Sequence, residues 1–144
     1  MATFLKNVNM VSRSSTQYLD EKLSDSDLRG YHGKYILTVC ARPGLSQEEI
    51  AREIFINKSN VARQLKVLEK LGYVERRASP EDKRKTLIYP TEKALDMRER
   101  IRSLNAAWRE EITRGFTEEE KEELVRLTAK LYKNAVEYME GTGD

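Results

Sequence analysis

Apolar residues recur at helical spacing in two short stretches near the middle of the chain. The apolar faces consist of Ile50, Ala51 and Ile54 in the first stretch and of Val61, Leu65, Leu68 and Leu71 in the second. Ser46, with Glu49 three residues later, matches a capping box at the start of the first stretch. Asn57 suits the N-cap of the second, and Gly72 stands where a left-handed residue commonly ends a helix. The pattern predicts two helices joined by a tight turn.

Two short β-prone runs follow these helices, at Val74 to Arg77 and at Thr86 to Tyr89. The polar loop between them contains Pro80 and carries three consecutive cations near its tip, Lys83, Arg84 and Lys85. Two short helices followed by a basic hairpin are typical of a winged helix-turn-helix. This fold places one helix in the major groove of duplex DNA and a charged ribbon on the flanking backbone or minor groove.

The second helix buries its apolar face, so its polar residues lie on the exposed side. Arginine pairs with guanine, and the amides of asparagine and glutamine pair with adenine, so Arg63, Asn60 and Gln64 suit base contacts. An alternative interpretation is that these residues only form a solvent-exposed helix face. The basic hairpin that follows the helix favours the interpretation as a DNA-binding face. The residues predicted to contact DNA are Lys58, Ser59, Asn60, Arg63, Gln64, Arg76, Lys83, Arg84 and Lys85.

The distribution of charge agrees with this prediction. The whole chain has a formal net charge of only +2. Residues 52–85, however, hold ten Lys and Arg against five Asp and Glu, whereas residues 86–144 hold ten against thirteen. Positive charge concentrated on the DNA-reading segment is what neutralisation of phosphates requires.

Both ends of the chain also have a helical period. The apolar positions near the start are Phe4, Val8, Val11, Tyr18 and Leu19, and those after the hairpin are Leu95, Met97, Ile101, Leu104, Trp108 and Ile112. Thr117 and Glu120 then match a second capping box. The stripe that follows has nearly the rhythm of a coiled coil and consists of Leu124, Leu127, Leu131, Ala135 and Tyr138.

The last stripe needs a surface that covers it. A small winged domain has one core face, which the helices of residues 46–71 already use. Pairing with a second copy in a two-fold dimer covers the stripe most simply, although the last helix folding back on its own domain is an open alternative. We therefore expect a mainly α (α+β) fold, in which residues 29–94 form the winged helix-turn-helix. Residues 1–28 and 95–144 form the helical dimerisation region.

The central segments resemble the MarR-type transcriptional regulators. The resemblance is carried by Pro43 to Ala51, Lys58 to Arg63, Leu68 to Val74, Asp82 to Arg84 and Pro90 to Ala94. Asp82 and Arg84 match the Asp-x-Arg of the family's wing. The resemblance implies that Arg84 reaches DNA and that Asp82 holds the wing in shape. It also implies a homodimer that represses transcription by occupying a promoter.

A small-molecule site is suggested by the aromatic segment before the apolar run Ile36 to Cys40. Tyr31, His32 and Tyr35 lie at the expected joint between the dimerisation region and the DNA reader. Members of the resembled family often bind small aromatic or phenolic anions at such a joint, which lowers their DNA affinity. These three side chains suit hydrogen bonding and stacking with such a ligand. The alternative is that these side chains bind no ligand and only pack between the dimerisation region and the DNA reader.

The composition excludes several other functions. One histidine and one cysteine cannot form a His/Cys metal cluster, and no phosphate-binding glycine loop or catalytic triad is recognisable. We expect no enzyme activity, metal or cofactor. Cys40 lies in an apolar run without a second cysteine, so we interpret it as a small buried hydrophobe. The apolar runs are too short to cross a membrane, and the start of the chain does not resemble a signal peptide, so we expect a cytoplasmic protein.

These observations predict a homodimeric, sequence-specific regulator of transcription that binds a pseudo-palindromic operator in double-stranded DNA. A small aromatic ligand is expected to release it. The alternative function is a winged-helix module for protein–protein interaction, on which the basic face is incidental.

Overall fold

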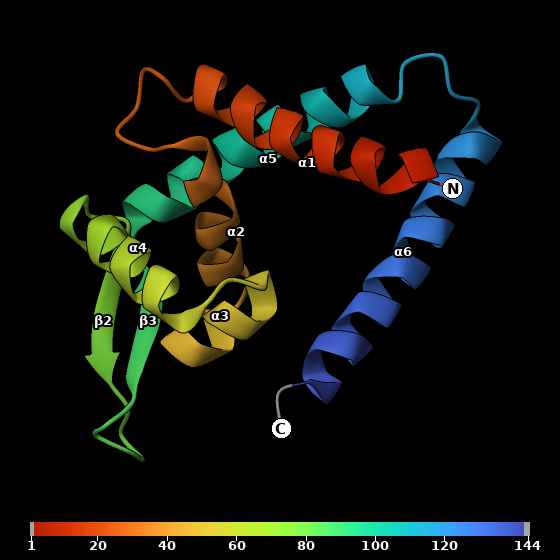
Figure 1. The fold of residues 1–144 in the computed structure, drawn as a ribbon. Coiled ribbons are helices and arrows are strands. Elements are labelled where there is room, and N and C mark those ends of the chain that lie inside the picture. Colours follow the sequence, from red (N-terminus) through yellow and green to blue (C-terminus); the bar gives the residue numbers. More distant parts are fainter. Residues whose placement is uncertain (1, 143–144) are drawn as a thin grey trace. The chain divides into compact units, whose positions relative to one another are not determined.

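The computed structural model of the chain describes residues 2–142, which form helices and one small antiparallel sheet (Figure 1). The elements are α1 (Ala2–Lys22), the 3-10 helix η1 (Gly30–His32), α2 (Gly33–Ala41), β1 (Leu45–Ser46), α3 (Gln47–Ile54), α4 (Lys58–Lys70), β2 (Val74–Ala78), β3 (Thr86–Pro90), α5 (Glu92–Ile112) and α6 (Glu118–Gly141). The chain divides into two compact units, one up to Trp108 and one from Arg109 onward. The mainly α fold class with a winged helix-turn-helix is confirmed.

The two helices of the predicted motif begin where their capping residues indicate. The Ser46 hydroxyl accepts the Glu49 N–H at 3.2 Å, and the Asn57 side chain accepts the Asn60 N–H at 2.8 Å. Between the helices, Phe55 adopts a left-handed conformation with φ 56°. This single residue reverses the chain tightly enough for only two non-helical residues to separate Ile54 from the Asn57 cap.

Gly72 ends α4 as predicted. Its φ of +86° is in the left-handed region that favours glycine. The Gly72 N–H donates to the Glu69 carbonyl at 3.0 Å, and the Tyr73 N–H donates to the Leu68 carbonyl at 2.9 Å. This pair of bonds satisfies carbonyls that the helix end leaves open, and it turns the chain directly into β2.

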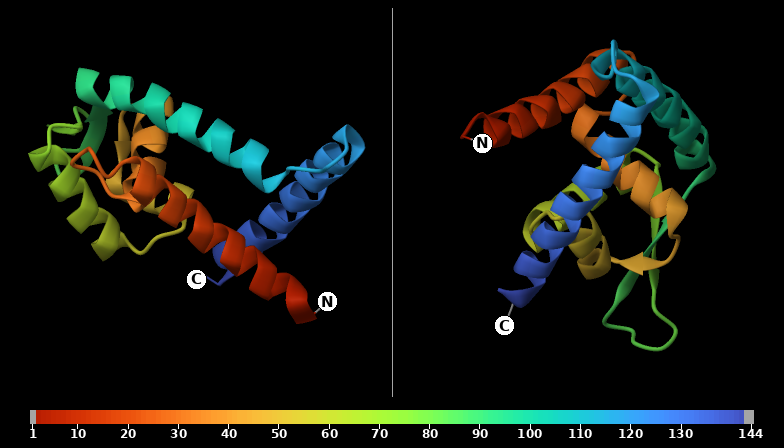
Figure 2. Two further views of the ribbon diagram at one scale, coloured as in Figure 1. Left: turned by 90° about the horizontal axis from the view of Figure 1, so that it is seen from above. Right: turned by 90° about the vertical axis from the view of Figure 1, so that its right-hand side faces the viewer.

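The sheet contains three strands in the order β1-β3-β2, one more strand than the sequence predicted. The hairpin β2–β3 pairs Val74 with Pro90 and Ala78 with Thr86. Strand β1 adds Leu45 opposite Ile88. It has only two residues, which are too few to form the alternating apolar and polar pattern by which a strand is predicted from sequence. The hairpin protrudes beyond the helices of its unit in Figures 1 and 2.

The core of the first unit lies around α2. Tyr35, Ile36 and Val39 are at most 1% exposed, and they pack with the buried faces of α3, α4 and β3. Cys40 is also buried, and burial raises the pKa of its thiol, so the group remains protonated. The interpretation of Cys40 as a small hydrophobe agrees with this environment.

Contacts of Tyr18, Ser15 and Asp20 help to attach helix α1 to the rest of the first unit. The Tyr18 ring stacks on Trp108 with 4.8 Å between centroids, and the Trp108 indole N–H donates to the Ser15 hydroxyl at 2.7 Å. Gly30 lies directly against the α1 backbone, and its N–H donates to the Asp20 carboxylate at 3.0 Å.

Helix α6 has the predicted capping box. The Thr117 hydroxyl accepts the Glu120 N–H at 3.1 Å, and the Glu120 carboxylate accepts the Thr117 N–H at 2.9 Å. None of the described residues of α6 is buried within the single chain. The exposed apolar side chains on this helix are Leu124, Val125, Leu127, Leu131, Tyr132, Tyr138 and Met139.

None of the helices within residues 2–142 combines the length and apolar character needed to cross a bilayer. Within the same residues, no group of three or more His, Cys, Asp or Glu side chains is placed to hold a metal ion.

Candidate nucleic-acid interface

The first two turns of α4 present polar side chains to solvent. Lys58, Ser59 and Arg63 are exposed and Asn60 is half-buried. The Arg63 guanidinium donates to the Asn60 side chain at 2.7 Å. The exposed N-terminal end of α4 therefore carries a paired amide and guanidinium close to a lysine.

Gln64, on the same helix, points back to the protein body. It is half-buried, and its amide oxygen lies 3.1 Å from Nε2 of His32. His32 is 2% exposed, and its Nδ1 accepts the Arg29 N–H at 3.0 Å. Because Nδ1 is an acceptor here, the proton of the neutral ring is on Nε2, which donates to Gln64. Burial lowers the pKa of His32, in agreement with a neutral ring.

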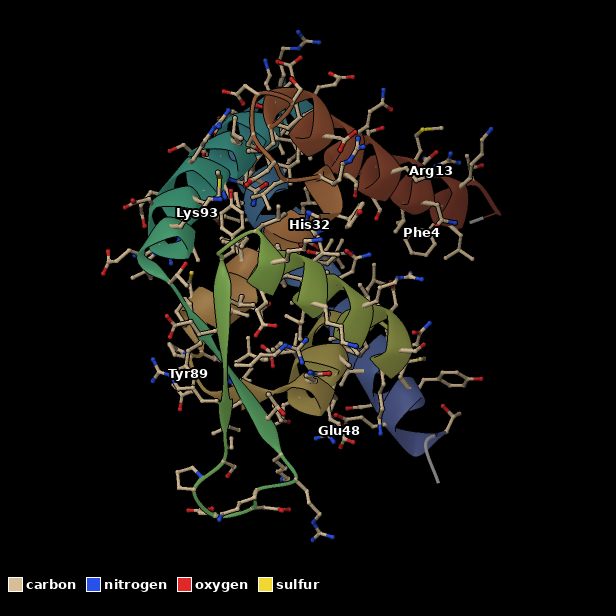
Figure 3. All side chains as sticks on the ribbon, turned by 90° about the vertical axis from the view of Figure 1, so that its left-hand side faces the viewer. Phe4, Arg13, His32, Glu48, Tyr89 and Lys93 are labelled. Carbon is tan, nitrogen blue, oxygen red and sulfur yellow. The ribbon has the colours of Figure 1, made fainter. Side chains whose placement is uncertain are left out.

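This geometry changes the interpretation of both residues. Both ring nitrogens of His32 are occupied inside the protein, and the Gln64 oxygen is held by His32. Figure 3 shows His32 where the segment that leads into α2 meets α4. The hydrogen bond therefore fixes the back of α4 to η1, and it uses one of the two groups with which Gln64 would recognise adenine.

The wing tip is ordered by Asp82. Its carboxylate accepts the Arg84 N–H at 3.0 Å and lies 3.3 Å from Nε of Arg84. The Arg84 side chain is nevertheless 93% exposed, and Lys83 and Lys85 are exposed on either side of it. The two roles that the family resemblance implies thus fall on residues with suitable geometry: Asp82 bonds to the loop and Arg84 extends into solvent.

Arg76 does not share this exposed surface. Its side chain is 19% exposed, and its Nε lies 3.5 Å from a carboxylate oxygen of Glu69 at the end of α4. The guanidinium therefore lies between β2 and α4. The sequence prediction placed Arg76 with the DNA contacts because the alternation of a strand does not reveal which face packs on a helix.

The sequence does not predict the groove that lies between the start of α3 and the wing. It has a volume of about 270 Å³ and is lined by Ser46, Gln47, Glu48, Arg84, Lys85 and Thr86. Glu48 also lies 3.5 Å from Nζ of Lys58 at the start of α4. The carboxylate of Glu48 therefore lies close to cations of the candidate interface. These cations, Lys58 and Lys85 among them, follow Glu48 in the sequence by 10 to 37 positions.

Hydrogen bonds from a buried tyrosine and a lysine hold the end of α4 in place. The Tyr73 hydroxyl donates to the Asp27 carboxylate at 2.5 Å. Lys93 donates to the other Asp27 oxygen at 2.8 Å and to the Leu71 carbonyl at 2.7 Å. The bond from Lys93, followed by that from Tyr73, lowers the pKa of Asp27. This network connects the segment after α1 with the end of α4 and the start of α5, so it orients α4.

The aromatic residues of the predicted ligand site are divided between surface and core. Tyr31 is 41% exposed and, with Arg13, Arg29 and three polar residues of α1, lines an open groove of about 590 Å³. Tyr35 is 1% exposed, and its hydroxyl has no hydrogen-bond partner among the described residues. Burial and the Tyr31 hydroxyl raise the pKa of Tyr35, so its hydroxyl is a protonated, unused donor.

Comparison with known proteins identifies the family. A model of the MarR family matches residues 34–85. The HTH-type transcriptional regulator BilQ of Clostridium symbiosum (strain WAL-14163) is 31% identical over 99 residues, which are 69% of this chain and 69% of BilQ. The chain belongs to the MarR family of transcriptional regulators. The function of this MarR-family protein is regulatory and not enzymatic.

Solved structures share the fold over almost the whole chain. The crystal structure of the transcriptional regulator SlyA superposes with a TM-score of 0.91 at 27% identity, covering 96% of this chain and 98% of that one. A protein from Listeria monocytogenes, crystallised in complex with a 26mer DNA, superposes with a TM-score of 0.89 at 22% identity. That superposition covers 97% of this chain and 95% of the other. At 22% identity the second likeness concerns the fold alone.

Proposed function

We propose that this MarR-family protein is a cytoplasmic homodimer that binds a pseudo-palindromic operator in duplex DNA and represses transcription by occupying it. The observation that carries the proposal is the joint exposure of cations on the first turns of α4 and at the wing tip, with Arg84 93% exposed. A protein of the same fold has been crystallised with DNA, which supports this use of the fold. Membership of a family of transcriptional regulators supports the regulatory role.

Within the proposed interface the residues have different tasks. Arg63 and Asn60 contact base edges, while Lys58, Ser59 and the wing cations Lys83, Arg84 and Lys85 contact phosphates or the minor groove. Asp82 shapes the wing. Gln64, which is hydrogen-bonded to His32, and Arg76, which is ion-paired with Glu69, mainly hold α4 and β2 in place.

A dimer is proposed because apolar side chains are exposed at both ends of the chain. Leu5, Val8 and Met10 on α1 are 46–65% exposed. On α6, Leu127 and Leu131 are 45% and 44% exposed. A two-fold dimer buries such surfaces and presents α4 twice, to half-sites about 10 bp apart.

Substitutions in α4 and in the wing should affect DNA binding differently. Arg63→Ala should weaken operator binding by about 1–3 kcal/mol and relax the preference at one position per half-site, because a base contact is lost. Arg84→Ala should weaken binding to all duplexes and reduce the salt slope by about one unit per wing, because a phosphate contact is lost. The measurement is affinity across a salt series, for an operator selected from random duplexes and for mixed-sequence DNA.

Arg102→Ala is the matched control, since Arg102 is an exposed arginine on α5 that pairs with Glu99. It should leave both affinities at the parental values. If binding of the parent to DNA were weak and insensitive to salt, the chain would instead be a protein–protein interaction module. If Arg63→Ala kept the parental sequence preference, α4 would not be the reading helix.

The proposed function includes release by a small aromatic carboxylate or phenol near Tyr31, His32 and Tyr35. The exposed Tyr31 ring offers a stacking surface, Arg13 and Arg29 line the same groove, and the Tyr35 hydroxyl is an unused donor. His32 would act through Gln64, because its own nitrogens are occupied. Such a ligand must bind more tightly to a conformation that cannot engage DNA.

Salicylate should dissociate the protein–operator complex, and a tenfold loss of affinity corresponds to about 1.4 kcal/mol of differential binding. Tyr31→Ala and Tyr35→Phe should each raise the salicylate concentration required, while His32→Ala should alter DNA affinity even without salicylate. Titration of the complex with salicylate and with benzyl alcohol, its uncharged and non-phenolic counterpart, measures this. Equal release of the parent, Tyr31→Ala and Tyr35→Phe would place the ligand elsewhere.

A further inference from the structure

Glu48 is an acidic side chain beside the cations that the proposed function assigns to phosphate contacts. It is the second residue of α3, and its side chain is 68% exposed. Figure 3 shows it at the lower edge of the helices, on the side from which the hairpin protrudes. Its surroundings come from two other elements, since Lys58 begins α4 and Arg84 and Lys85 belong to the wing.

We propose that Glu48 sets the overall affinity of the protein for duplex DNA by occupying Lys58 and by repelling the phosphates that the neighbouring cations attract. This proposal rests on the proposed function, because it assigns a role within the DNA interface. The carboxylate of Glu48 pairs with Lys58 in the free protein, and a DNA phosphate must displace it before it can bind Lys58.

The geometry supports displacement. The Lys58 Nζ and the Glu48 carboxylate are 3.5 Å apart, and the Lys58 side chain is 75% exposed. An exposed ion pair of this kind contributes little free energy, so a phosphate can replace the carboxylate at small cost. After the exchange the carboxylate remains beside the groove that Arg84 and Lys85 line, where its charge opposes that of the bound phosphate.

A second role for Glu48 would be purely structural, because a carboxylate in the first turn of a helix interacts favourably with the helix dipole. Glu49 occupies the same turn, and its backbone N–H is already capped by Ser46. A structural role predicts a change in thermal stability without a change in DNA affinity. The affinity role predicts a change in DNA affinity with the fold intact.

The discriminating variant is Glu48→Gln in the full-length protein. We expect its affinity for both selected operator and mixed-sequence duplex to rise about threefold per subunit, or about tenfold for a dimer, for one screened charge at several ångströms. The ratio of the two affinities should stay at the parental value, because the charge acts on phosphates and not on bases. Glu48→Asp, which keeps the charge, should bind like the parent.

Glu53→Gln is the matched control for net charge. Glu53 lies on the same helix and pairs with Arg42 at 2.7 Å, but it does not line the groove. Its replacement should leave DNA affinity unchanged, and circular dichroism should show that all three variants are folded. A smaller operator affinity in Glu48→Gln, or an affinity equal to that of the parent, would overturn the proposal.

Different results refute the proposed function and the role of Glu48. A parent that does not bind duplex DNA refutes the proposed function. A parent that binds with steep salt dependence, together with an unchanged Glu48→Gln, refutes only the role of Glu48.

Discussion

Replacing Leu127 and Leu131 by aspartate should leave no stably folded monomer. In a dimer the two changes affect four buried leucines, each of which contributes about 1.5–3 kcal/mol through burial. The combined loss is comparable with the whole stability of a typical domain, and four buried carboxylates would add a further penalty. Analytical ultracentrifugation should show aggregates, and circular dichroism should show the loss of the α6 helix.

The physical reason is that α6 has no buried residue within its own chain. An isolated helix gains too little from its own hydrogen bonds to be stable in water, so packing against a partner must hold it. Ala129→Asp with Lys133→Asp introduces the same two carboxylates two residues after Leu127 and Leu131, about 200° around the helix and so on the opposite side of α6, and this control should remain dimeric. A folded, monomeric parent at micromolar concentration would contradict the dimer.

Gly30→Ala should destabilise the first unit severely. A Cβ at this position would stand 2.2 Å from the Thr16 carbonyl oxygen and 2.7 Å from the Asp20 backbone nitrogen. Both atoms belong to the backbone of α1, so relief of the clash requires the whole helix to move. We expect a loss of about 3 kcal/mol or more, which lowers the midpoint of thermal unfolding by about 6–12 °C.

Trp108 reports on this change, because it is the only tryptophan and contacts Ser15 and Tyr18 of α1. Its fluorescence should follow the release of α1, while circular dichroism follows overall unfolding. Gly141→Ala is the control, since the Cβ it would add meets no atom within 4 Å beyond its chain neighbours and the adjacent backbone of its own helix. Parental stability of Gly30→Ala would mean that α1 does not pack against Gly30 in solution.

Helix-capping residues, a helix-ending glycine and strand-prone runs in the sequence predict the elements that carry the proposed function. Asn57 and Thr117 begin helices because a side chain can bond to an N–H three residues later, and Gly72 ends one because it tolerates a positive φ. The β-prone runs and the polar loop likewise placed the wing to within one residue. These features depend on neighbours a few positions apart, so a pattern of residues is enough to predict the winged helix-turn-helix.

Which of the side chains predicted to contact DNA are free to do so depends on partners from distant parts of the chain. Gln64 bonds to His32, 32 positions away, and Arg76 turns toward Glu69. Glu48 lies beside the wing, and Gly30 lies against α1. The physical reason is that a periodic pattern gives the face on which a side chain lies, but not the residue of another element that it meets. For the charged and polar groups of an interface, that partner decides whether the side chain remains free for a ligand.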